Sequence, residues 1–346
     1  MSHKGINRRQ FIRLNTAALA GITAAPATIA KSSKGAERRI KDTTENASPG
    51  FYRFSFGDKK VTVLSDGYFY YSPDLVTIDD PVEIQAHNAD PETRKEYFRS
   101  RRLPTSHIPL QANPVVIDSG NQRTLIDPGG RTSEEWPMLG RLGLSLEAAD
   151  IAPESIDYIL LTHAHPDHMG GLLNPANGAP VFPNAEVVIS EREHKFWTGD
   201  DVVSAQEPPF ITEAAEISVA MVHEALKSLD DRIRIVQGEE EVTDGIRSIP
   251  SPGHLPGHVC FALESEGQQL LLTGDAIVFP HTSFEYPEWH LFTDLNRDEA
   301  ARSRNQLLDR ATADEMFILG FHFPFPGLGY AIKNDKAYRW QPAVTV

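Results

Sequence analysis

The ten residues THAHPDHMGG, at positions 162–171, place three histidines and one aspartate within six positions, His163 to His168. The apolar run Tyr158–Leu161 before them predicts a buried strand that ends at this loop. Neutral imidazole and carboxylate are the side chains from which proteins build zinc sites. A polar loop that contains histidines by chance is the alternative for this string taken alone. A metal site at a strand end would constrain the fold more than a chance cluster of histidines would. The remaining ligands of such a site are expected at the ends of other strands.

Three further candidate ligands follow apolar runs later in the chain: His254 in SPGHLPGH, Asp275 in LLLTGDAI and His322 in ILGFHFPFPG. Polar side chains at strand ends sit on a scaffold that is rigid enough for a metal site. Within the first string, His163 and His165 are separated by one residue and can converge on one ion when the loop bends. Asp167 and His168 then point elsewhere and can serve a second ion.

Strand-like runs separated by helical patterns fill both halves of the chain from residue 51 onward. Two hairpins are predicted first: FYRFSFG with KKVTVLSDG, and NPVVIDSGNQRTLIDPGG with Gly120-Asn121 as its turn. Later expected strands are AEVVIS, RIRIVQG, GIRSIPSPGH, HVCFALES, QQLLLTGDAI and, as the final strand, MFILGFH. Helices are expected within 79–104, from EREHKFW, and over 213–229 and 297–312. This order predicts an α/β fold, an αββα sandwich of two packed mixed sheets with helices outside.

Four motifs in order, THAHPDHMGG, SPGH, TGD and GFH, resemble the metallo-β-lactamase-fold superfamily over most of the chain from about residue 51. The resemblance implies an αββα fold with a two-metal site between the sheets. It also implies a role for each candidate ligand: His163, His165 and His254 for the first ion, Asp167, His168 and His322 for the second, and Asp275 as the bridge. Two divalent ions per chain are therefore expected, and zinc suits this ligand set.

The motifs also distinguish subfamilies. Asp275 supplies a bridge that true β-lactamases of this fold lack, and His165 stands where the redox di-iron branch has a glutamate. The nearer resemblance is to the methyl parathion hydrolase group and the quorum-quenching lactonases, through VTVLSDG, LIDPGG, FPNAEVV, HKFW, SPGHLPGH, HFPFPGLGY and KAYRWQPAV. The implied activity is hydrolysis of small neutral esters, lactones or organophosphate triesters by a metal-bridging hydroxide. Asp275 would orient the hydroxide, and Asp167 would help to take its proton.

Three alternatives stay open: a nuclease of the same fold, a β-lactamase or thioester hydrolase activity, and a catalytically silent metal-binding module. The formal net charge of −15 disfavours a nuclease, because such a protein repels phosphate backbones at long range. All seven ligand positions are filled, which disfavours the silent module.

Aromatic residues near the candidate ligands predict a substrate pocket with an apolar mouth for an aryl or acyl group. The expected lining residues are Phe196, Trp197, Phe284, Tyr286 and Trp289. Core packing is the alternative for each of them. His258 is expected beside the ligands rather than among them, and surface or pocket positions are expected for His194, His223, His281 and His290. Cys260 is expected to be a buried core residue.

The first thirty residues contain four basic residues and no acidic ones, followed by an Ala-rich apolar run. This order is typical of a bacterial export signal, and NRRQFIRL resembles a twin-arginine signal. The alternative is a disordered basic tail followed by a short helix. Cleavage after Ala27 or after Ala30 fits the small-residue rule. We therefore expect a signal peptide at 1–30, a polar linker at 31–50 and the hydrolase domain at 51–346, in a periplasmic or secreted protein.

Removing residues 1–30 would take the formal net charge from −15 to −19. The expected partners are a small-molecule substrate and the twin-arginine export machinery, without nucleic acid, and a homodimer is an open alternative. The apolar run is too short for a stable membrane anchor. The single cysteine allows no internal disulfide, which suits a protein that folds before it is exported.

Overall fold

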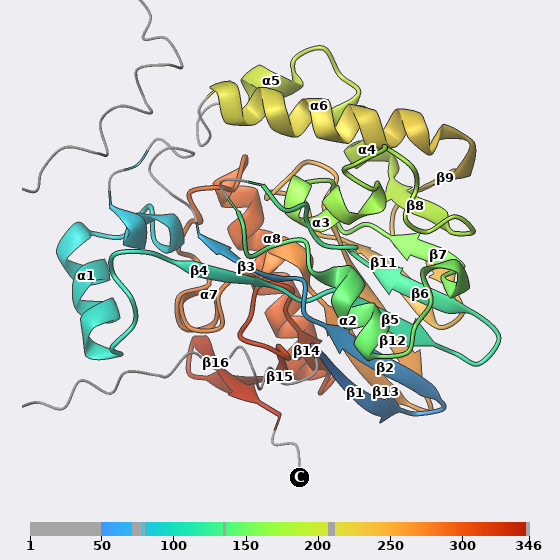
Figure 1. The fold of residues 1–346 in the computed structure, drawn as a ribbon. Coiled ribbons are helices and arrows are strands. Elements are labelled where there is room, and N and C mark those ends of the chain that lie inside the picture. Colours follow the sequence, from blue (N-terminus) through green and yellow to red (C-terminus); the bar gives the residue numbers. More distant parts are fainter. Residues whose placement is uncertain (1–49, 71–77, 79, 134–135, 207–211, 344–346) are drawn as a thin grey trace, which may run out of the picture. The chain divides into compact units, whose positions relative to one another are not determined.

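The predicted strands pair into two large sheets (Figure 1). The computed structural model describes residues 50–70, 78, 80–133, 136–206 and 212–343. Within them, the first sheet has the strand order β1 (Phe51–Phe56), β2 (Lys59–Leu64), β5 (Val115–Asp118), β6 (Arg123–Ile126), β7 (Tyr158–Leu160), β8 (Glu186–Ser190) and β9 (Ile233–Val236). Neighbours are antiparallel from β1 to β6 and parallel from β6 to β9.

The second sheet is antiparallel except at one junction. Its order is β10 (Glu241–Thr243), β11 (Ile246–Pro250), β12 (Val259–Ser265), β13 (Gln268–Leu272), β14 (Phe317–Leu319), β15 (Leu328–Asn334) and β16 (Ala337–Pro342). Only β13 and β14 pair in parallel among these strands. The crossover between them contains the helix α8 (Arg297–Ala313), as parallel neighbours require.

Side chains alternate between the two faces of each strand and form three apolar layers. One layer lies between the sheets, and one covers the outer face of each sheet. In β8, Val188 faces the layer between the sheets, while its neighbours Val187 and Ile189 face the outer side. In β13, Leu271 faces outward and the leucines on either side of it face inward. Because successive side chains of a strand point to opposite faces, each sheet buries both faces.

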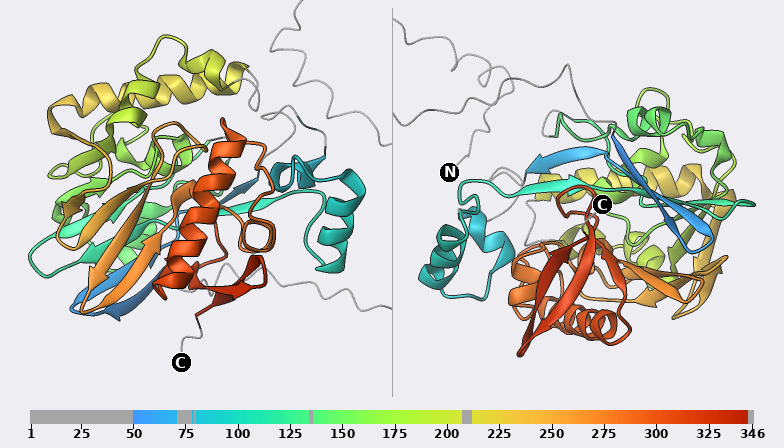
Figure 2. Two further views of the ribbon diagram at one scale, coloured as in Figure 1. Left: turned by 180° about the vertical axis from the view of Figure 1, so that it is seen from behind. Right: turned by 90° about the horizontal axis from the view of Figure 1, so that it is seen from below.

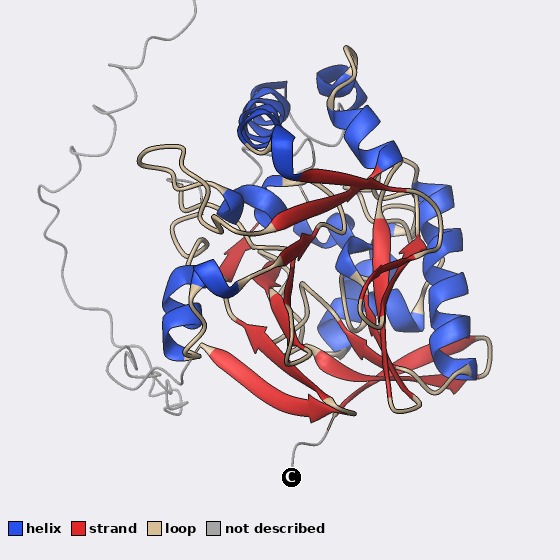
Figure 3. Ribbon diagram, turned by 90° about the vertical axis from the view of Figure 1, so that its right-hand side faces the viewer, coloured by secondary structure: helices blue, strands red, loops and turns tan. Residues whose placement is uncertain are grey.

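Helices cover the two outer faces, and Figure 3 shows them around the strands. On the first sheet, the outer layer includes side chains from α2 (Leu142–Ala148), α4 (Glu191–Trp197) and α6 (Thr212–Ser228). On the second sheet it includes side chains from α7 (Thr282–Glu285) and α8, and Figure 2 shows α8 across that face. The expected αββα sandwich is confirmed.

A smaller unit lies beside the sandwich. It contains the two-stranded pair β3 (Gly67–Tyr70) and β4 (Pro109–Ala112), with η3 (Pro81–Gln85) and α1 (Pro91–Ser100) between them in the chain. Figure 1 draws β3 in blue and the other three elements in teal. The remaining short helices are η4 (Pro153–Ser155), α3 (Pro166–Met169), η5 (Gly170–Leu172), α5 (Val202–Ala205), η6 (Asp230–Arg232) and η7 (Gly274–Ala276).

The structure differs from the sequence-based prediction at the C-terminal end. MFILGFH does not form the final strand, because the hairpin β15–β16 follows β14 and extends the same sheet. The ribbon β3–β4 and the strand β10 were not predicted either; each is only three or four residues long, too short for a clear alternation.

The expected signal peptide and linker lie outside the described residues, apart from Gly50. Among the described helices, none combines the length and apolar character needed to cross a bilayer.

Candidate metal centre

The seven candidate ligands come together where four strands end. His163, His165, Asp167 and His168 occupy the loop from β7 into α3, and His254 lies between β11 and β12. Asp275 lies in η7 directly after β13, and His322 follows β14. All seven side chains are buried or nearly so. Strands from both sheets therefore contribute to one centre between them.

The first group of ligand atoms is formed by imidazoles alone. The Nε2 atoms of His163 and His254 each lie 3.0 Å from Nδ1 of His165. These three residues offer nitrogen atoms close enough together to hold one ion.

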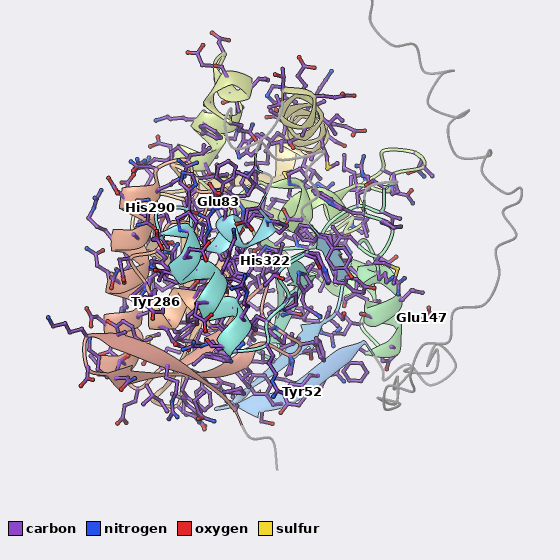
Figure 4. The ribbon with its side chains drawn as sticks, turned by 90° about the vertical axis from the view of Figure 1, so that its left-hand side faces the viewer. Tyr52, Glu83, Glu147, Tyr286, His290 and His322 are labelled. Carbon is purple, nitrogen blue, oxygen red and sulfur yellow. The ribbon has the colours of Figure 1, made fainter. Side chains whose placement is uncertain are left out.

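The second group adds a carboxylate. Nε2 of His168 lies 3.3 Å from Nε2 of His322, and Oδ2 of Asp167 lies 3.5 Å from the former and 3.3 Å from the latter. In the view of Figure 4, His322 lies toward the middle of the molecule, with Tyr286 and His290 to one side and Glu147 to the other.

Asp275 faces both groups. Its Oδ1 lies 3.1 Å from Nε2 of His168 and 3.1 Å from Nε2 of His322, both in the second group. Its Oδ2 lies 3.3 Å from Nε2 of His254, in the first group. One carboxylate therefore lies between the two groups, with one oxygen directed at each.

The donor set fits divalent zinc. Zinc–nitrogen bonds of about 2.0–2.1 Å in a tetrahedron place ligand atoms about 3.3 Å apart, which is close to the spacing of these nitrogens. Neutral imidazole nitrogens this close would repel one another through their lone pairs unless a cation or a proton lay between them. The spacing of these nitrogens therefore fits zinc at this position as well as it fits a shared proton.

Acceptors behind the imidazoles fix which nitrogen faces the centre. Nδ1 of His168 lies 2.9 Å from Oδ2 of Asp127, and Nδ1 of His254 lies 3.0 Å from Oδ1 of Asp294. Nδ1 of His322 donates to the carbonyl oxygen of Gln111 over 2.6 Å. With its proton engaged at Nδ1, each ring directs Nε2 into the centre, as outer partners of metal-bound histidines do.

The sequence-based reasoning missed these acceptors. Asp127 lies in LIDPGG, and an acidic residue directly after a strand was the one signal that could have found it. Asp294 has no comparable signal. It also accepts from the buried guanidinium of Arg304 over 3.2 Å, and Arg304 in turn donates to the carbonyl oxygens of Pro287 and Trp289.

A third missed residue is Glu193 of α4. Its Oε1 accepts from the backbone N–H of Ala164, between the first two histidines, over 2.9 Å, and from Nε1 of Trp197 over 2.8 Å. Burial raises the pKa of Glu193 to about 7, against the opposing effect of these donors. This side chain ties α4 to the loop that carries His163 and His165.

Carboxylates control protonation in the metal-free centre. Burial alone would lower the pKa of His322, but the carboxylates of Asp275 and Asp167 outweigh it and raise that pKa to about 9. Burial acts to raise the pKa of Asp275, yet the facing imidazoles, led by His322, bring it well below its usual value. In His165, burial and the neighbouring His254 together lower the pKa to about 3. A divalent cation must therefore displace protons from the imidazoles that face carboxylates.

The predicted pocket aromatics separate into distinct places. Trp197 is fully buried, with its ring nearly perpendicular to that of His165 at 5.8 Å between centroids, and Phe196 packs against it. Phe284 is also fully buried, in the outer core of the second sheet. Neither Trp197 nor Phe284 has surface to offer a ligand in this structure, so a pocket role would require either side chain to move.

Tyr286 and Trp289 lie differently. Their rings stack 4.1 Å apart and both contact Tyr97. They belong to the same apolar cluster as Phe321, whose ring stacks on His168 at 4.0 Å. That cluster, which also includes Phe69, forms the apolar surroundings of the second ligand group.

Among the described residues, the other histidines are not part of either ligand group. His258 lies beside the centre, as expected, and accepts from the backbone N–H of Asp275 over 3.0 Å. His223 contacts the carbonyl oxygen of Trp197, and His290 pairs with Asp298. Cys260 is buried, and burial raises the pKa of its thiol to about 12.

Comparisons with known proteins agree with this geometry. Residues 107–322 match the family described as the metallo-beta-lactamase superfamily. An N-acyl homoserine lactonase of Bacillus cereus is 32% identical over 180 residues, which span 49% of this chain and 61% of the relative.

Two solved structures are similar over most of the chain. Hydrolase AbOPH, described as a member of the beta lactamase superfamily, has a TM-score of 0.76 at 25% identity, covering 87% of this chain and 100% of that one. AidC, described as a dizinc quorum-quenching lactonase, has a TM-score of 0.76 at 24% identity, covering 86% of this chain and 98% of that one. The likeness to AidC is one of fold.

Proposed function

The chain belongs to the metallo-beta-lactamase superfamily and is a metal-dependent hydrolase, and on that premise we propose that it uses two zinc ions to hydrolyse small neutral esters, lactones or organophosphate triesters. The observation that carries the proposal is the position of Asp275, with one oxygen directed at each of two groups of ligand atoms. A centre for a single ion would not need a buried carboxylate between two such groups.

The chain's own residues would hold the two ions as follows: His163, His165 and His254 for the first, Asp167, His168 and His322 for the second, and Asp275 between them. Such ions supply Lewis acidity, which polarises a carbonyl or phosphoryl oxygen and lowers the pKa of water. Asp127 and Asp294 keep two of the imidazoles in the orientation that binding requires.

Two carboxylates would orient the attacking water and accept its proton. Asp275 can orient an attacking water by accepting a hydrogen bond from it, and Asp167 stands beside His168 and His322, where it can accept the proton that the water gives up. A cysteine nucleophile is not part of the proposal, because the thiol of Cys260 is buried and donates to the carbonyl oxygen of Thr273.

The substrate class follows from the surroundings of the second group. Phe321 stacks on His168 and Phe69 lies against His322, and these rings form an apolar wall beside the second group that suits an acyl or aryl group. Tyr286 and Trp289 stack on each other in the same cluster, behind that wall. The lactonase activity in the name of the Bacillus cereus relative supports a lactone among the substrates. The net charge of −15 favours a neutral substrate over a polyanion.

A kinetic panel on zinc-loaded protein tests the proposal. It compares N-acyl lactones, aryl esters and phosphotriesters with a β-lactam, an acyl thioester and single-stranded RNA, and zinc content is measured on the same samples. We expect about two zinc ions per chain and values of kcat/KM at least about 100-fold higher for the first three classes. A chain that binds one ion, or that prefers RNA or the β-lactam, would contradict the proposal.

We also propose that the protein is exported folded through the twin-arginine pathway and acts in the periplasm or outside the cell. NRRQFIRL and the Ala-rich run after it support this proposal.

A further inference from the structure

We infer that His258, Ser251 and Cys260 form a clamp that positions Asp275, with His258 as its positioning residue. The inference rests on the proposed function only in that Asp275 is taken to bridge two ions. Neither the ligand set nor the proposed chemistry uses these three side chains. All three are buried beside the turn that carries Asp275.

The first contact determines where the proton of His258 resides. The backbone N–H of Asp275 donates to Nε2 of His258 over 3.0 Å. A ring nitrogen that accepts a hydrogen bond carries no proton, so the proton of the neutral ring is on Nδ1. Nδ1 lies 2.9 Å from Oγ of Ser251 and therefore donates to it. With both nitrogens engaged in this way, His258 has none left for a metal ion.

The contact between Cys260 and Thr273 determines which group donates in the hydrogen bond between Ser251 and Cys260. The thiol of Cys260 lies 3.2 Å from the carbonyl oxygen of Thr273, which can only accept. The single thiol proton is used there, so the hydroxyl of Ser251 is the donor in its 3.2 Å contact with Sγ of Cys260. The bonds form one directed chain from the N–H of Asp275 to the carbonyl of Thr273.

The two ends of this chain are the two ends of one tight turn. Thr273, Gly274 and Asp275 connect β13 to the centre, and Gly274 has φ of 45°. A Cβ at position 274 would lie 2.8 Å from Nε2 of His258 and 2.7 Å from Oγ1 of Thr162. The ring of His258 therefore packs against bare backbone, which only glycine allows at that distance.

This placement matters because Asp275 must direct its oxygens at two groups at once. The oxygens lie 3.1 Å and 3.3 Å from their nearest imidazole partners in the two groups. A small rotation of the turn would move one oxygen away from its group. The clamp opposes that rotation from the backbone side, as partners behind a metal ligand do.

Two matched variants separate the clamp from simple filling of space. In His258→Gln, the side-chain amide reaches the position of Nε2 and can still accept from the N–H of Asp275. In His258→Asn, the amide reaches only the position of Nδ1, so the contact with Asp275 is lost. We expect His258→Asn to weaken the second zinc ion by about 10–100-fold in a chelator competition titration, and His258→Gln to stay within about 3-fold of the wild type.

A second readout needs no metal. In zinc-free protein, ¹⁵N NMR of the histidine rings should show His258 protonated at Nδ1 and not at Nε2. Ser251→Ala removes the acceptor of that proton and should increase the Nε2-protonated form. Cys260→Ala keeps the acceptor and should leave the Nδ1 form dominant.

The outcomes distinguish this inference from the proposed function. A wild-type chain that binds fewer than two zinc ions would contradict the proposed function, whereas the tautomer of His258 would still report on the clamp. A proton on Nε2 of His258 in the zinc-free wild type would overturn the clamp. Equal zinc affinity in His258→Gln and His258→Asn, whether both are weakened or both unchanged, would overturn it as well.

Discussion

Because its carboxylate lies between the two ligand groups, Asp275 is the residue at which we expect charge to matter most. Two cations in a centre that excludes water repel strongly, and a carboxylate between them offsets part of that repulsion. Asp275→Asn keeps the size and removes the charge. We expect kcat to fall by about 100-fold or more, while KM for a neutral ester changes much less because the apolar wall is untouched. Steady-state kinetics with zinc content measured on the same samples test this.

Tyr286→Ala is the matched control for that experiment. It shortens a side chain packed against the apolar cluster that forms the wall and leaves the ligand atoms in place, so it should mainly raise KM. An Asp275→Asn enzyme with two bound ions and near-normal kcat would show that Asp275 is not the bridge.

Protonation of His322 gives a prediction that concerns metal loading. Its pKa is raised to about 9, so the ring keeps its proton below that pH in zinc-free protein and loses it above. Zinc binding near pH 7.5 should therefore release at least about one proton per chain, and fewer near pH 10. Calorimetric titrations in buffers with different ionisation enthalpies count the protons. Release of the same number of protons at both pH values would argue against a His322 ring that the facing carboxylates keep protonated near pH 7.5.

The positions of the ligands could be predicted from the sequence, but their supporting acceptors could not. Four candidate ligands lie in one short string, and the others follow apolar runs that end in the same way. The acceptors lie far along the chain: Asp127 is 41 residues from His168, and Asp294 is 40 residues from His254. Contacts at such separations arise only from the packing of one element on another.

At the scale of elements, one buried carboxylate joins the end of β2 to two loops. Oδ2 of Asp66 accepts from the N–H groups of Gly130 and Gly140 over 2.8 and 3.2 Å, and Oδ1 accepts from that of Leu142 over 2.6 Å. In Asp66→Asn, the NH₂ group must face at least one backbone N–H. We expect a loss of about 3 kcal/mol in the free energy of unfolding of zinc-free protein, because a buried unsatisfied donor costs about 1–3 kcal/mol.

Urea unfolding measures that loss, and Asp118→Asn provides the comparison. Asp118 accepts from the N–H of Gly120 and from Nε of Arg123 at a partly exposed turn, where water can replace the lost interactions, so we expect a loss below about 1 kcal/mol. Similar losses in the two variants would mean that the Asp66 contacts do not stabilise the loops around α2.

Strands with a clear alternation or run of apolar residues could be predicted from the sequence, and strands without one could not. The hairpin β1–β2 and the strand β8 alternate or run apolar over five or six residues, and both were predicted. The ribbon β3–β4 pairs GYFY with PLQA, which offers no comparable pattern. Trp197 and Phe284 illustrate the same limit for single residues, because an aromatic side chain near a ligand in sequence can turn into the core as easily as into a pocket.

The whole molecule determines when the centre can form. Ligands come from the ends of β7, β11, β13 and β14, which belong to both sheets, so the complete set exists only after the two sheets pack together. The chain has one cysteine, and it is buried. An oxidising compartment could therefore add no internal disulfide to stabilise it, and zinc binding to the folded state is the available source of extra stability.

The proposed export of the folded protein gives the last prediction, which concerns the arginine pair in NRRQFIRL. Arg8→Lys combined with Arg9→Lys should leave the precursor in the cytoplasm, folded, active and loaded with about two zinc ions, because all seven candidate ligands lie far beyond residues 1–30. Arg13→Lys keeps the pair and serves as the control, which should still be exported. Fractionation of cells, with activity and zinc content measured in each fraction, tests the prediction. Normal export of the double variant, or export from cells without the twin-arginine translocase, would show that the segment directs the protein by another route.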